Sequence, residues 1–321
     1  MVNNLVNQKD IIPLLSICIP TYNRYKLLRY NLNEVLIQSK SFSHNIEILV
    51  GNNGSLDNTD QILKSFKNIN VLNIDLNEGI NPMIYLLTKR AKGKYIWILG
   101  DDDIPNKGLI EIIINNIIKS KKEKISFFLE GSIYTSEEEL TQKICSENII
   151  NIKKVNNATR NIIEKSGFIS SNIILREKYL YYLQRSLSFE SGNAYATKYG
   201  TLACHVKSNE IYILKNALKI GRITNKESHF ISNPNSIIKT FLLDEFNICI
   251  QLYSDKIITF RQLIININNI VSLTRLIPII KSIWYKLFIF LVVLTNYLII
   301  FFINCFRILF ILIGKLFMKK N

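Results

Sequence analysis

Apolar and polar positions along the first 120 residues predict strands and helices in regular succession. Short apolar runs that read as buried strands occupy residues 14–19, 46–50, 70–74 and 95–99. Segments with apolar side chains at helical spacing follow them, at residues 25–38, 57–66, 81–91 and 106–119. Strands that alternate with helices form a mainly parallel sheet covered by helices on both faces. The sequence therefore predicts an α/β fold.

Three polar segments directly follow three of the predicted strands. They are Pro20–Asn23, Asn52–Ser55 and Asp101–Asp103. Ligands of open α/β sheets bind at the carboxyl ends of the strands. We therefore expect these segments to contribute to one binding site.

The acidic segment places three carboxylates side by side. Burial of such charges is costly in free energy unless a cation neutralises them. A hard divalent cation takes oxygen ligands and often bridges to phosphates. An acidic turn before the helix that begins near Asn106 is the simpler alternative, but one Asp would satisfy that role. The triplet Asp101, Asp102 and Asp103 is therefore predicted to be a metal site.

Some function classes are disfavoured by motifs that the chain lacks. No Gly-x-Gly-x-x-Gly follows the first predicted strand, and no Walker-type Gly-Lys-Ser/Thr loop occurs. A dinucleotide oxidoreductase and a P-loop NTPase are therefore disfavoured. The five Cys residues are scattered and lack metal-type spacing, which fits a reducing compartment.

The net charge of +15 is concentrated towards the C-terminus, where residues 251–321 hold nine Lys and Arg against one Asp. Basic side chains beside an apolar stretch suit a membrane with anionic lipid. Nucleic-acid binding is not expected, because the sequence shows no recognisable module and no basic segment interleaved with aromatics.

An apolar run of 20 residues, Leu287–Phe306, contains no charged residue. It is long enough to cross the hydrocarbon core once. Because Lys and Arg flank it on both sides, the positive-inside rule does not set its orientation, and an interfacial arrangement is the alternative. No apolar signal segment is evident near Met1. The expected location is the cytoplasmic face of the inner cell membrane.

Four blocks of sequence together resemble family 2 glycosyltransferases of the GT-A fold. The blocks are Ser16–Arg24 (SICIPTYNR), Glu47–Thr59 (EILVGNNGSLDNT), Asn77–Gly79 (NEG) and Gly93–Asp103 (GKYIWILGDDD). Their order and spacing match the family over residues 14–120. The Leu-Gly-Asp-Asp-Asp form is similar to a bacterial branch of abequosyltransferase-like enzymes of surface-polysaccharide assembly.

The resemblance implies a Rossmann-like, mainly parallel mixed sheet between helices and a nucleotide-sugar site at its edge. The residues implied to bind the donor are Pro20, Thr21, Tyr22, Asn23, Asn52, Asn53, Asp101 and Asp102. The family usually has an acidic pair where this chain has Asn52 and Asn53. Since an amide donates as well as accepts, we expect the pocket to tolerate a base other than uracil.

The resemblance also implies a Mg²⁺ or Mn²⁺ ion that offsets charge on the leaving nucleoside diphosphate. Asp101 and Asp103 fit the Asp-x-Asp spacing of metal ligands, and Asp101 with Asp102 is the alternative pair. Gly100 stands where the family commonly has an acid, so the choice between the pairs stays open.

An inverting transfer needs a base that takes the proton of the acceptor hydroxyl. In the family this base lies roughly ninety residues beyond the metal motif, which points to Glu190. His205, Glu177 and Glu164 are the competing candidates, and Glu190 as a solvated surface acid is the simpler interpretation.

The predicted organisation has five segments. They are an N-terminal tail (1–13), the nucleotide-sugar-binding half (14–120) and the acceptor-binding half (121–250) of a GT-A domain, a basic helical connector (251–283) and a membrane-anchoring segment (284–321).

The predicted function is metal-dependent, inverting transfer of a sugar from a nucleotide-sugar donor to a lipid-linked or surface-glycan acceptor. A sugar-nucleotide nucleotidyltransferase is the alternative enzyme, although its glycine-rich basic first loop is missing here. A nucleotide-binding partner without turnover is the non-enzyme alternative, raised by Asn52, Asn53 and Gly100.

Overall fold

The structure is a computed structural model of the 321-residue chain. It describes residues 12–122, 124–142, 149–158, 162, 165–187, 196–221, 245–259 and 262–263. All of them belong to one compact unit, Met1–Ile267, and the second unit, Asn268–Asn321, lies outside the described residues.

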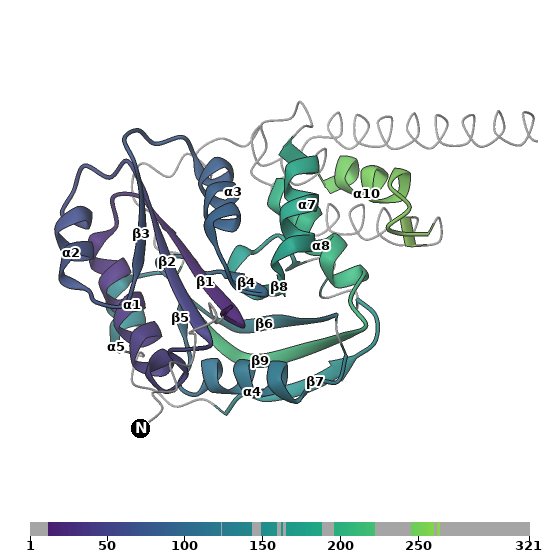
Figure 1. The fold of residues 1–321 in the computed structure, drawn as a ribbon, viewed down its shortest axis with the longest axis horizontal. Coiled ribbons are helices and arrows are strands. Elements are labelled where there is room, and N and C mark those ends of the chain that lie inside the picture. The colour runs from purple at the N-terminus through teal and green to yellow at the C-terminus, as the bar shows by residue number, and fades with distance from the viewer. Residues whose placement is uncertain are drawn as a thin grey trace, which may run out of the picture. The chain divides into compact units, whose positions relative to one another are not determined.

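In the described residues a single mixed sheet of nine strands forms the centre of the unit (Figure 1). The strands are β1 (Leu15–Thr21), β2 (Ile46–Asn53), β3 (Asn70–Ile74), β4 (Tyr95–Ile98), β5 (Ile104–Pro105), β6 (Ile125–Tyr134), β7 (Asn151–Val155), β8 (Asn172–Leu175) and β9 (Glu210–Gly221). Their spatial order is β3-β2-β1-β4-β8-β6-β9-β5, and β7 pairs with β9.

Helices connect the strands and cover the sheet. The α-helices are α1 (Tyr25–Ser39), α2 (Thr59–Ser65), α3 (Ile80–Arg90), α4 (Leu109–Lys119), α5 (Glu137–Gln142), α7 (Arg176–Leu187), α8 (Ala196–Val206) and α10 (Glu245–Ser254). Two 3₁₀ turns, η1 (Lys40–Phe42) and η2 (Ile169–Ser171), complete the assigned elements.

The first half of the sheet confirms the predicted α/β order. Strands β1 to β4 pair in parallel, and helices α1 to α4 follow them in turn. These elements form where they were predicted because each strand is a short apolar run and each helix carries one apolar face. The parallel pairing brings the carboxyl ends of β1, β2 and β4 to one edge of the sheet.

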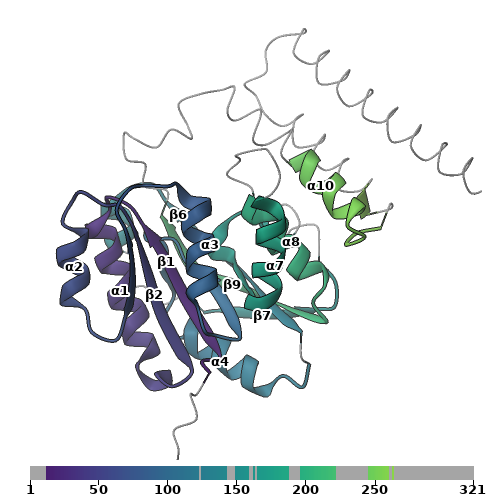
Figure 2. The ribbon, with the colours of Figure 1, turned by 45° about the horizontal axis from the view of Figure 1, so that its top comes forward.

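Opposite faces of β1 pack against different helices, as the alternation of side chains along a strand requires. Ile17 belongs to a core cluster that includes Leu28 of α1 and Ile113 of α4. Cys18 belongs to another cluster, with Met83 of α3 and further residues of α7. The two layers of helices on either side of the sheet are visible in Figure 2.

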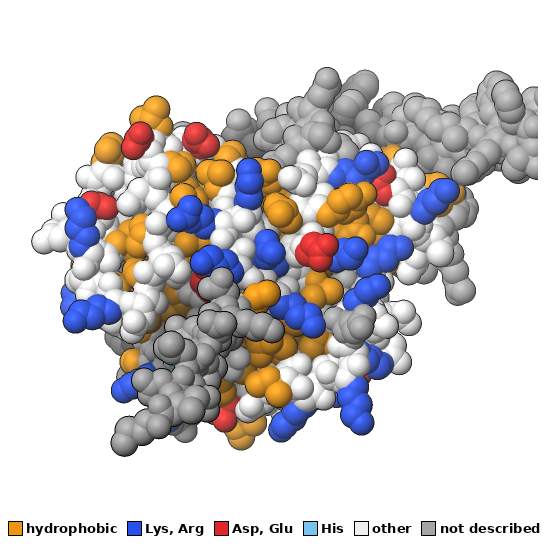
Figure 3. Space-filling view, viewed as in Figure 1, with side chains coloured by type: hydrophobic (Ala, Val, Ile, Leu, Met, Phe, Trp, Pro, Cys, Tyr) orange, Lys and Arg blue, Asp and Glu red, His pale blue; other side chains and the backbone are white. Residues whose placement is uncertain are grey.

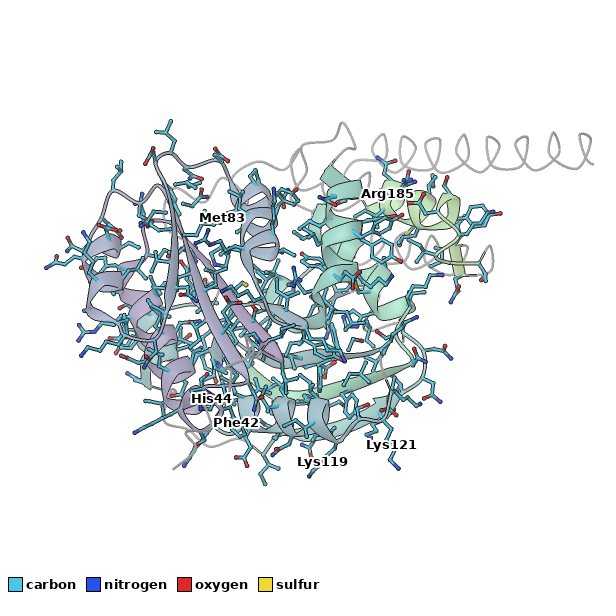
Figure 4. The ribbon with its side chains drawn as sticks, viewed as in Figure 1. Phe42, His44, Met83, Lys119, Lys121 and Arg185 are labelled. Atoms are coloured by element: carbon cyan, nitrogen blue, oxygen red, sulfur yellow. The ribbon has the colours of Figure 1, made fainter. Side chains whose placement is uncertain are left out.

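Close packing of α3 on the sheet depends on a glycine in β2. A Cβ atom at Gly51 would lie 2.4 Å from the sulfur of Met83, which Figure 4 labels on α3. The absence of a side chain at Gly51 therefore lets α3 approach β2 closely. Because Gly51 immediately precedes Asn52 and Asn53, this packing also fixes the strand end that enters the predicted site.

The second half of the sheet introduces antiparallel pairs. β8 lies between β4 and β6 and runs antiparallel to both, whereas β9 runs parallel to β6. The end of β9 pairs with β5, just after the acidic triplet. The long strand β9 therefore carries Gly221, its last residue, back to the edge where β1, β2 and β4 end.

Helix α10 is joined to α7 and α8 through one carboxylate. Asp255, directly after α10, accepts two hydrogen bonds from the guanidinium of Arg185 and one from the hydroxyl of Tyr199. Figure 4 labels Arg185 on α7, next to α10. These contacts continue the compact unit past the boundary at residue 250 that the sequence suggested.

No helix among the residues that the structure describes has the length and apolar composition needed to cross a membrane. The predicted anchoring segment, 284–321, lies outside those residues. Attachment through it therefore stays a prediction.

Candidate active site

Two loops at the carboxyl edge of the sheet are tied together by hydrogen bonds. The backbone N–H of Asn23 donates to the Ser55 hydroxyl at 3.0 Å, and the Asn23 side-chain oxygen accepts from the N–H of Leu56 at 2.8 Å. Asn23 adopts the left-handed region, with φ of 52°, which Asn tolerates better than most residues. The loop after β1 therefore contacts the loop after β2, as predicted.

The acidic segment contacts the same loop. The Thr21 hydroxyl donates to Asp101 Oδ2 at 2.7 Å, and both side chains are buried. Pro20 is also buried, whereas Tyr22 and Asn23 are half-buried. The structure thus brings together the three segments that the sequence selected.

The guanidinium of Arg24, which was not selected from the sequence, forms ion pairs with two of the three acids. Arg24 Nη1 lies 3.2 Å from Asp101 Oδ1 and 2.9 Å from Asp102 Oδ2. The Arg24 side chain is 23% exposed and the two carboxylates 8% and 15%. Burial lowers the pKa of Arg24, but the two carboxylates together raise it by more than burial lowers it. The pKa of Arg24 therefore lies above its ordinary value. Arg24 is therefore a permanent cation that bridges the pair.

The third acid is held by the scaffold. Asp103 Oδ2 accepts from the Ser170 hydroxyl and Asp103 Oδ1 accepts from the N–H of Gly221 at 3.0 Å. The Asn31 amide donates to the backbone oxygens of Gly100, at 3.0 Å, and of Asp103. Segments from α1, η2 and β9 thus fix the acidic turn in one conformation.

The protonation of all three acids is shifted in the same direction. Burial and then the charge of Asp101 raise the pKa of Asp102 to about 7, with Arg24 acting against the rise. Burial also raises the pKa of Asp101, against Arg24 and Thr21. Burial and the charge of Asp102 hold the pKa of Asp103 well above its usual range. Burial and repulsion among the acids therefore outweigh the positive charge of Arg24, so each carboxyl keeps its proton to a higher pH than an exposed Asp does.

The fit of a divalent ion can be judged from these oxygens. Among the described residues, no group of three His, Cys, Asp or Glu is arranged to hold a metal. However, Asp101 Oδ1 and Asp102 Oδ2 already converge on one cation, Arg24 Nη1. Both oxygens of Asp103 accept hydrogen bonds from the scaffold instead. The geometry therefore favours Asp101 with Asp102 over Asp101 with Asp103 as the cation-facing pair.

Gly100, where the family commonly has an acid, is explained by the crowding around it. A Cβ atom at Gly100 would lie 2.8 Å from Asp103 Oδ2, 3.2 Å from Asp102 Oδ1 and 3.3 Å from the Ser170 hydroxyl. A fourth carboxylate would therefore force these side chains apart. Glycine leaves the space in which Ser170 donates to Asp103.

The two amides after β2 have different contacts. Asn53 donates to the Asn77 side-chain oxygen at 2.9 Å and to Gly79 O at 3.2 Å, and accepts from the N–H of Glu78 at 3.2 Å. Asn52 Oδ1 accepts from the N–H of Ser55 at 3.2 Å. Because an Asp at position 53 could not donate, the amide is needed to hold the turn 77–79. This contact gives Asn53 a role in holding the loop that the sequence did not suggest.

The predicted base and one competitor, Glu190 and Glu164, lie outside the described residues. Glu177 is exposed in the first turn of α7. It follows Leu175, which pairs with Tyr95 at the amino end of β4, whereas Asp101 follows the carboxyl end of that strand. Glu177 therefore lies at the wrong end of the sheet for a base at this site.

His205 is fully buried in a hydrogen-bond network of its own. Its Nε2 donates to Asn172 Oδ1, and its Nδ1 accepts from the Ser126 hydroxyl, both at 2.9 Å. Burial lowers the pKa of His205 to about 3. The ring is therefore neutral at physiological pH, and its two nitrogens are already engaged with β6 and β8.

The buried His205 is expected to make stability fall in mild acid. Its folded-state pKa lies below its unfolded value, so the unfolded chain binds the proton first and stability is lost as pH falls below about 6.5. The expected loss attributable to this ring is about 3 kcal/mol between pH 7 and 4. Urea unfolding of wild type and His205→Gln at several pH values measures it. Equal pH slopes for the two proteins would contradict the buried neutral state.

Four residues of the site were not found from the sequence: Arg24, Asn31, Ser170 and Gly221. Two of them could have been found from their sequence context. Arg24 closes the first motif block, and Asn31 is a polar residue on the buried face of α1, between Leu28 and Leu32. The sequence gives no indication of Ser170 and Gly221, because they lie 67 and 118 residues along the chain from Asp103.

Comparison with known proteins identifies the family. The model of glycosyl transferase family 2 matches residues 16–183, just over half of the chain. The chain belongs to glycosyl transferase family 2.

Two curated relatives illustrate the similarity. The minor teichoic acid biosynthesis protein GgaA of Bacillus subtilis is 31% identical over 137 residues, which cover 41% of this chain and 30% of that protein. The abequosyltransferase RfbV of Salmonella typhimurium is 34% identical over 105 residues, 31% of each chain. The matched region thus spans less than a third of the length of these relatives.

Solved structures agree on the fold. TarS residues 1–349 of S. aureus superpose with a TM-score of 0.57 at 15% identity, over 85% of this chain and 76% of that one. The same protein in complex with UDP-GlcNAc gives a TM-score of 0.54 at 16% identity, over 74% and 66%. The curled mixed sheet is therefore a GT-A fold, which confirms that part of the prediction.

Proposed function

We propose that this chain is a glycosyltransferase that moves one sugar from a nucleotide-sugar donor to a lipid-linked or surface-glycan acceptor, with inversion. The observation that carries the proposal is the meeting of Thr21, Arg24, Asp101 and Asp102 at the carboxyl edge of the sheet. Support also comes from family membership, from relatives named for teichoic acid biosynthesis and abequose transfer, and from a fold neighbour solved with UDP-GlcNAc.

The residues at this edge would have different roles in binding the metal ion and the nucleotide-sugar donor. Asp101 and Asp102 would hold the Mg²⁺ or Mn²⁺ ion, which supplies positive charge for the leaving nucleoside diphosphate. Thr21 orients Asp101 through its hydroxyl, and Arg24 adds a second positive charge beside the same oxygens. Asn53 holds the turn 77–79 against the loop after β2, which shapes the wall of the donor pocket.

The chemical step transfers the sugar between two oxygen atoms. The acceptor hydroxyl attacks the anomeric carbon from the side opposite the nucleoside diphosphate, a new C–O bond forms, and the bond to the diphosphate breaks. Glu190 is our proposed base for the hydroxyl proton, because a carboxylate suits that role and its position fits the family spacing.

We further propose that residues 284–321 attach the protein to the cytoplasmic face of the cell membrane. The uncharged run Leu287–Phe306 supports attachment, and basic residues on both sides suit anionic lipid headgroups. A lipid-linked acceptor lies in the bilayer plane, so attachment would keep the enzyme beside its substrate.

One experiment tests both parts of this function. The full chain, residues 1–283 and full-length Glu190→Gln are each separated into membrane and soluble fractions and incubated with UDP-, GDP-, CDP- or dTDP-sugars and Mn²⁺. We expect metal-dependent sugar release or transfer in the membrane fraction of the full chain and in the soluble fraction of 1–283. Glu190→Gln should bind donor without turnover.

The outcomes separate the alternatives. Donor binding without turnover in the wild type would identify a non-catalytic binding partner. Formation of a nucleotide sugar from nucleoside triphosphate and sugar phosphate would indicate a nucleotidyltransferase. A 1–283 protein that still sediments with membranes would reject attachment through 284–321.

A further inference from the structure

A small basic pocket lies at the edge of the sheet opposite the acidic site. It has a volume of about 170 Å³, and three lysines, Lys124, Lys178 and Lys207, contribute to its walls. Lys124 immediately precedes β6, Lys178 lies in the first turn of α7, and Lys207 follows α8. Leu175, also in the wall, pairs with Tyr95 at the amino end of β4. The pocket is therefore separate from the donor site.

No carboxylate is among the described residues that line this pocket. Glu177, next to Lys178 in α7, is exposed and is not among the lining residues, and two acids of neighbouring elements have partners elsewhere. Glu210 lies 3.7 Å from Lys122 Nζ and 3.8 Å from Lys154 Nζ, and Asp255 accepts hydrogen bonds from Arg185. Three lysines therefore line one small space that has no acid among its described lining residues, and Lys207 Nζ also donates to the Lys256 carbonyl oxygen at 3.4 Å.

Helix dipoles do not explain this arrangement. A lysine after the C-terminus of a helix is favourable, which accounts for Lys207 alone. Lys178 lies in the first turn of α7, where a cation is unfavourable. Lys124 lies at the start of a strand. An anion in the pocket would offset the repulsion among the three lysines and the unfavourable position of Lys178.

The remaining wall suits a phosphate with a small organic substituent. Leu175 and Cys204 are apolar, and Tyr182 is half-buried beside them. Burial raises the pKa of Tyr182, so its hydroxyl keeps its proton. The volume is below the range of about 300–1,000 Å³ that drug-sized ligands occupy. A single phosphate group with part of a headgroup matches this size.

We propose that this pocket binds a phosphate group, carried by an anionic membrane lipid or by a soluble phosphate. Lysine ammonium groups bind phosphate as point charges, and three lysines line this pocket. Further basic residues lie at the same edge of the sheet, namely Lys92, Lys94, Lys121 and Lys122. On the face shown in Figure 3, Lys and Arg side chains are widespread and acidic ones are few, and Figure 4 labels Lys121 projecting outwards. The proposal does not depend on the proposed function.

Calorimetric titration of the full-length protein in detergent tests the pocket. The probes are inorganic phosphate, dihexanoyl-phosphatidylglycerol and, as a neutral lipid, dihexanoyl-phosphatidylcholine, at one fixed salt concentration. The test variant carries Lys124→Gln, Lys178→Gln and Lys207→Gln. The matched control carries Gln at the exposed positions Lys40, Lys64 and Lys67, which removes the same charge from elsewhere.

We expect the test variant to bind at least tenfold more weakly and the control variant to bind like the wild type. Binding of phosphatidylglycerol alone would identify a lipid headgroup as the ligand, and binding of inorganic phosphate would identify a soluble phosphate. Equal losses in the two triple variants would overturn the proposal. So would failure of the wild type to bind any anionic probe. Because the substituted lysines are exposed, thermal unfolding of both variants should match the wild type.

Discussion

Replacing Asp102 by Asn is expected to reduce sugar transfer by about 10²- to 10³-fold while leaving the fold intact, since electrostatic groups at a leaving group are worth that much. Asp102 has the more exposed carboxylate of the cation-facing pair, and it accepts a hydrogen bond from Arg24. The neutral amide removes the charge that would hold the metal ion. It also relieves repulsion with Asp101, so thermal stability without metal should not fall.

The neighbouring acid provides the comparison for this prediction. Asp103→Asn should lower the free energy of unfolding by about 1–3 kcal/mol, because an amide cannot accept from both the Ser170 hydroxyl and the Gly221 N–H. Asp75→Asn, at an exposed position, should change neither the rate of sugar transfer nor the free energy of unfolding. Transfer rates and thermal unfolding of the three variants provide the test. An active Asp102→Asn beside a folded but inactive Asp103→Asn would return the metal site to Asp101 and Asp103.

Replacing Arg24 by Gln is expected to destabilise the metal-free protein and to make it depend on a divalent ion. Loss of Arg24 leaves Asp101 and Asp102 without their bridging cation. Removing one partner of a deeply buried pair costs about 3–5 kcal/mol. Since the Arg24 side chain is 23% exposed, we expect a smaller cost, about 1–3 kcal/mol.

Thermal unfolding with and without Mn²⁺ measures this effect. Mn²⁺ should raise the Tm of Arg24→Gln more than that of the wild type, because the ion replaces the missing positive charge at the same oxygens. Arg29→Gln, at an exposed position on α1, the helix that Arg24 immediately precedes, is the matched control and should respond like the wild type. A Mn²⁺ response of Arg24→Gln no larger than that of Arg29→Gln would argue against a shared cation position.

Local pattern predicted the donor half of the fold closely. The strand predicted at residues 95–99 is β4, at Tyr95–Ile98, and the helix predicted at 106–119 is α4, at Leu109–Lys119. Prediction succeeded here because a buried strand and an amphipathic helix each leave their periodicity in consecutive residues. The second half was less predictable. The segment Ile169–Leu175, for example, divides into the turn η2 and the short strand β8.

By itself the sequence determined which segments approach the site and where its acids lie. Only the tertiary structure decided what surrounds them. Arg24 meets Asp101 across 77 residues, Ser170 meets Asp103 across 67, and Gly221 meets Asp103 across 118. Side-chain periodicity records which face of an element is buried, but it carries no information about a partner so far along the chain. The pairing of β8 and β9 with the rest of the sheet places Ser170 and Gly221 beside Asp103. It therefore separates Asp101 and Asp102, which face a cation, from Asp103, which is held by hydrogen bonds to the scaffold.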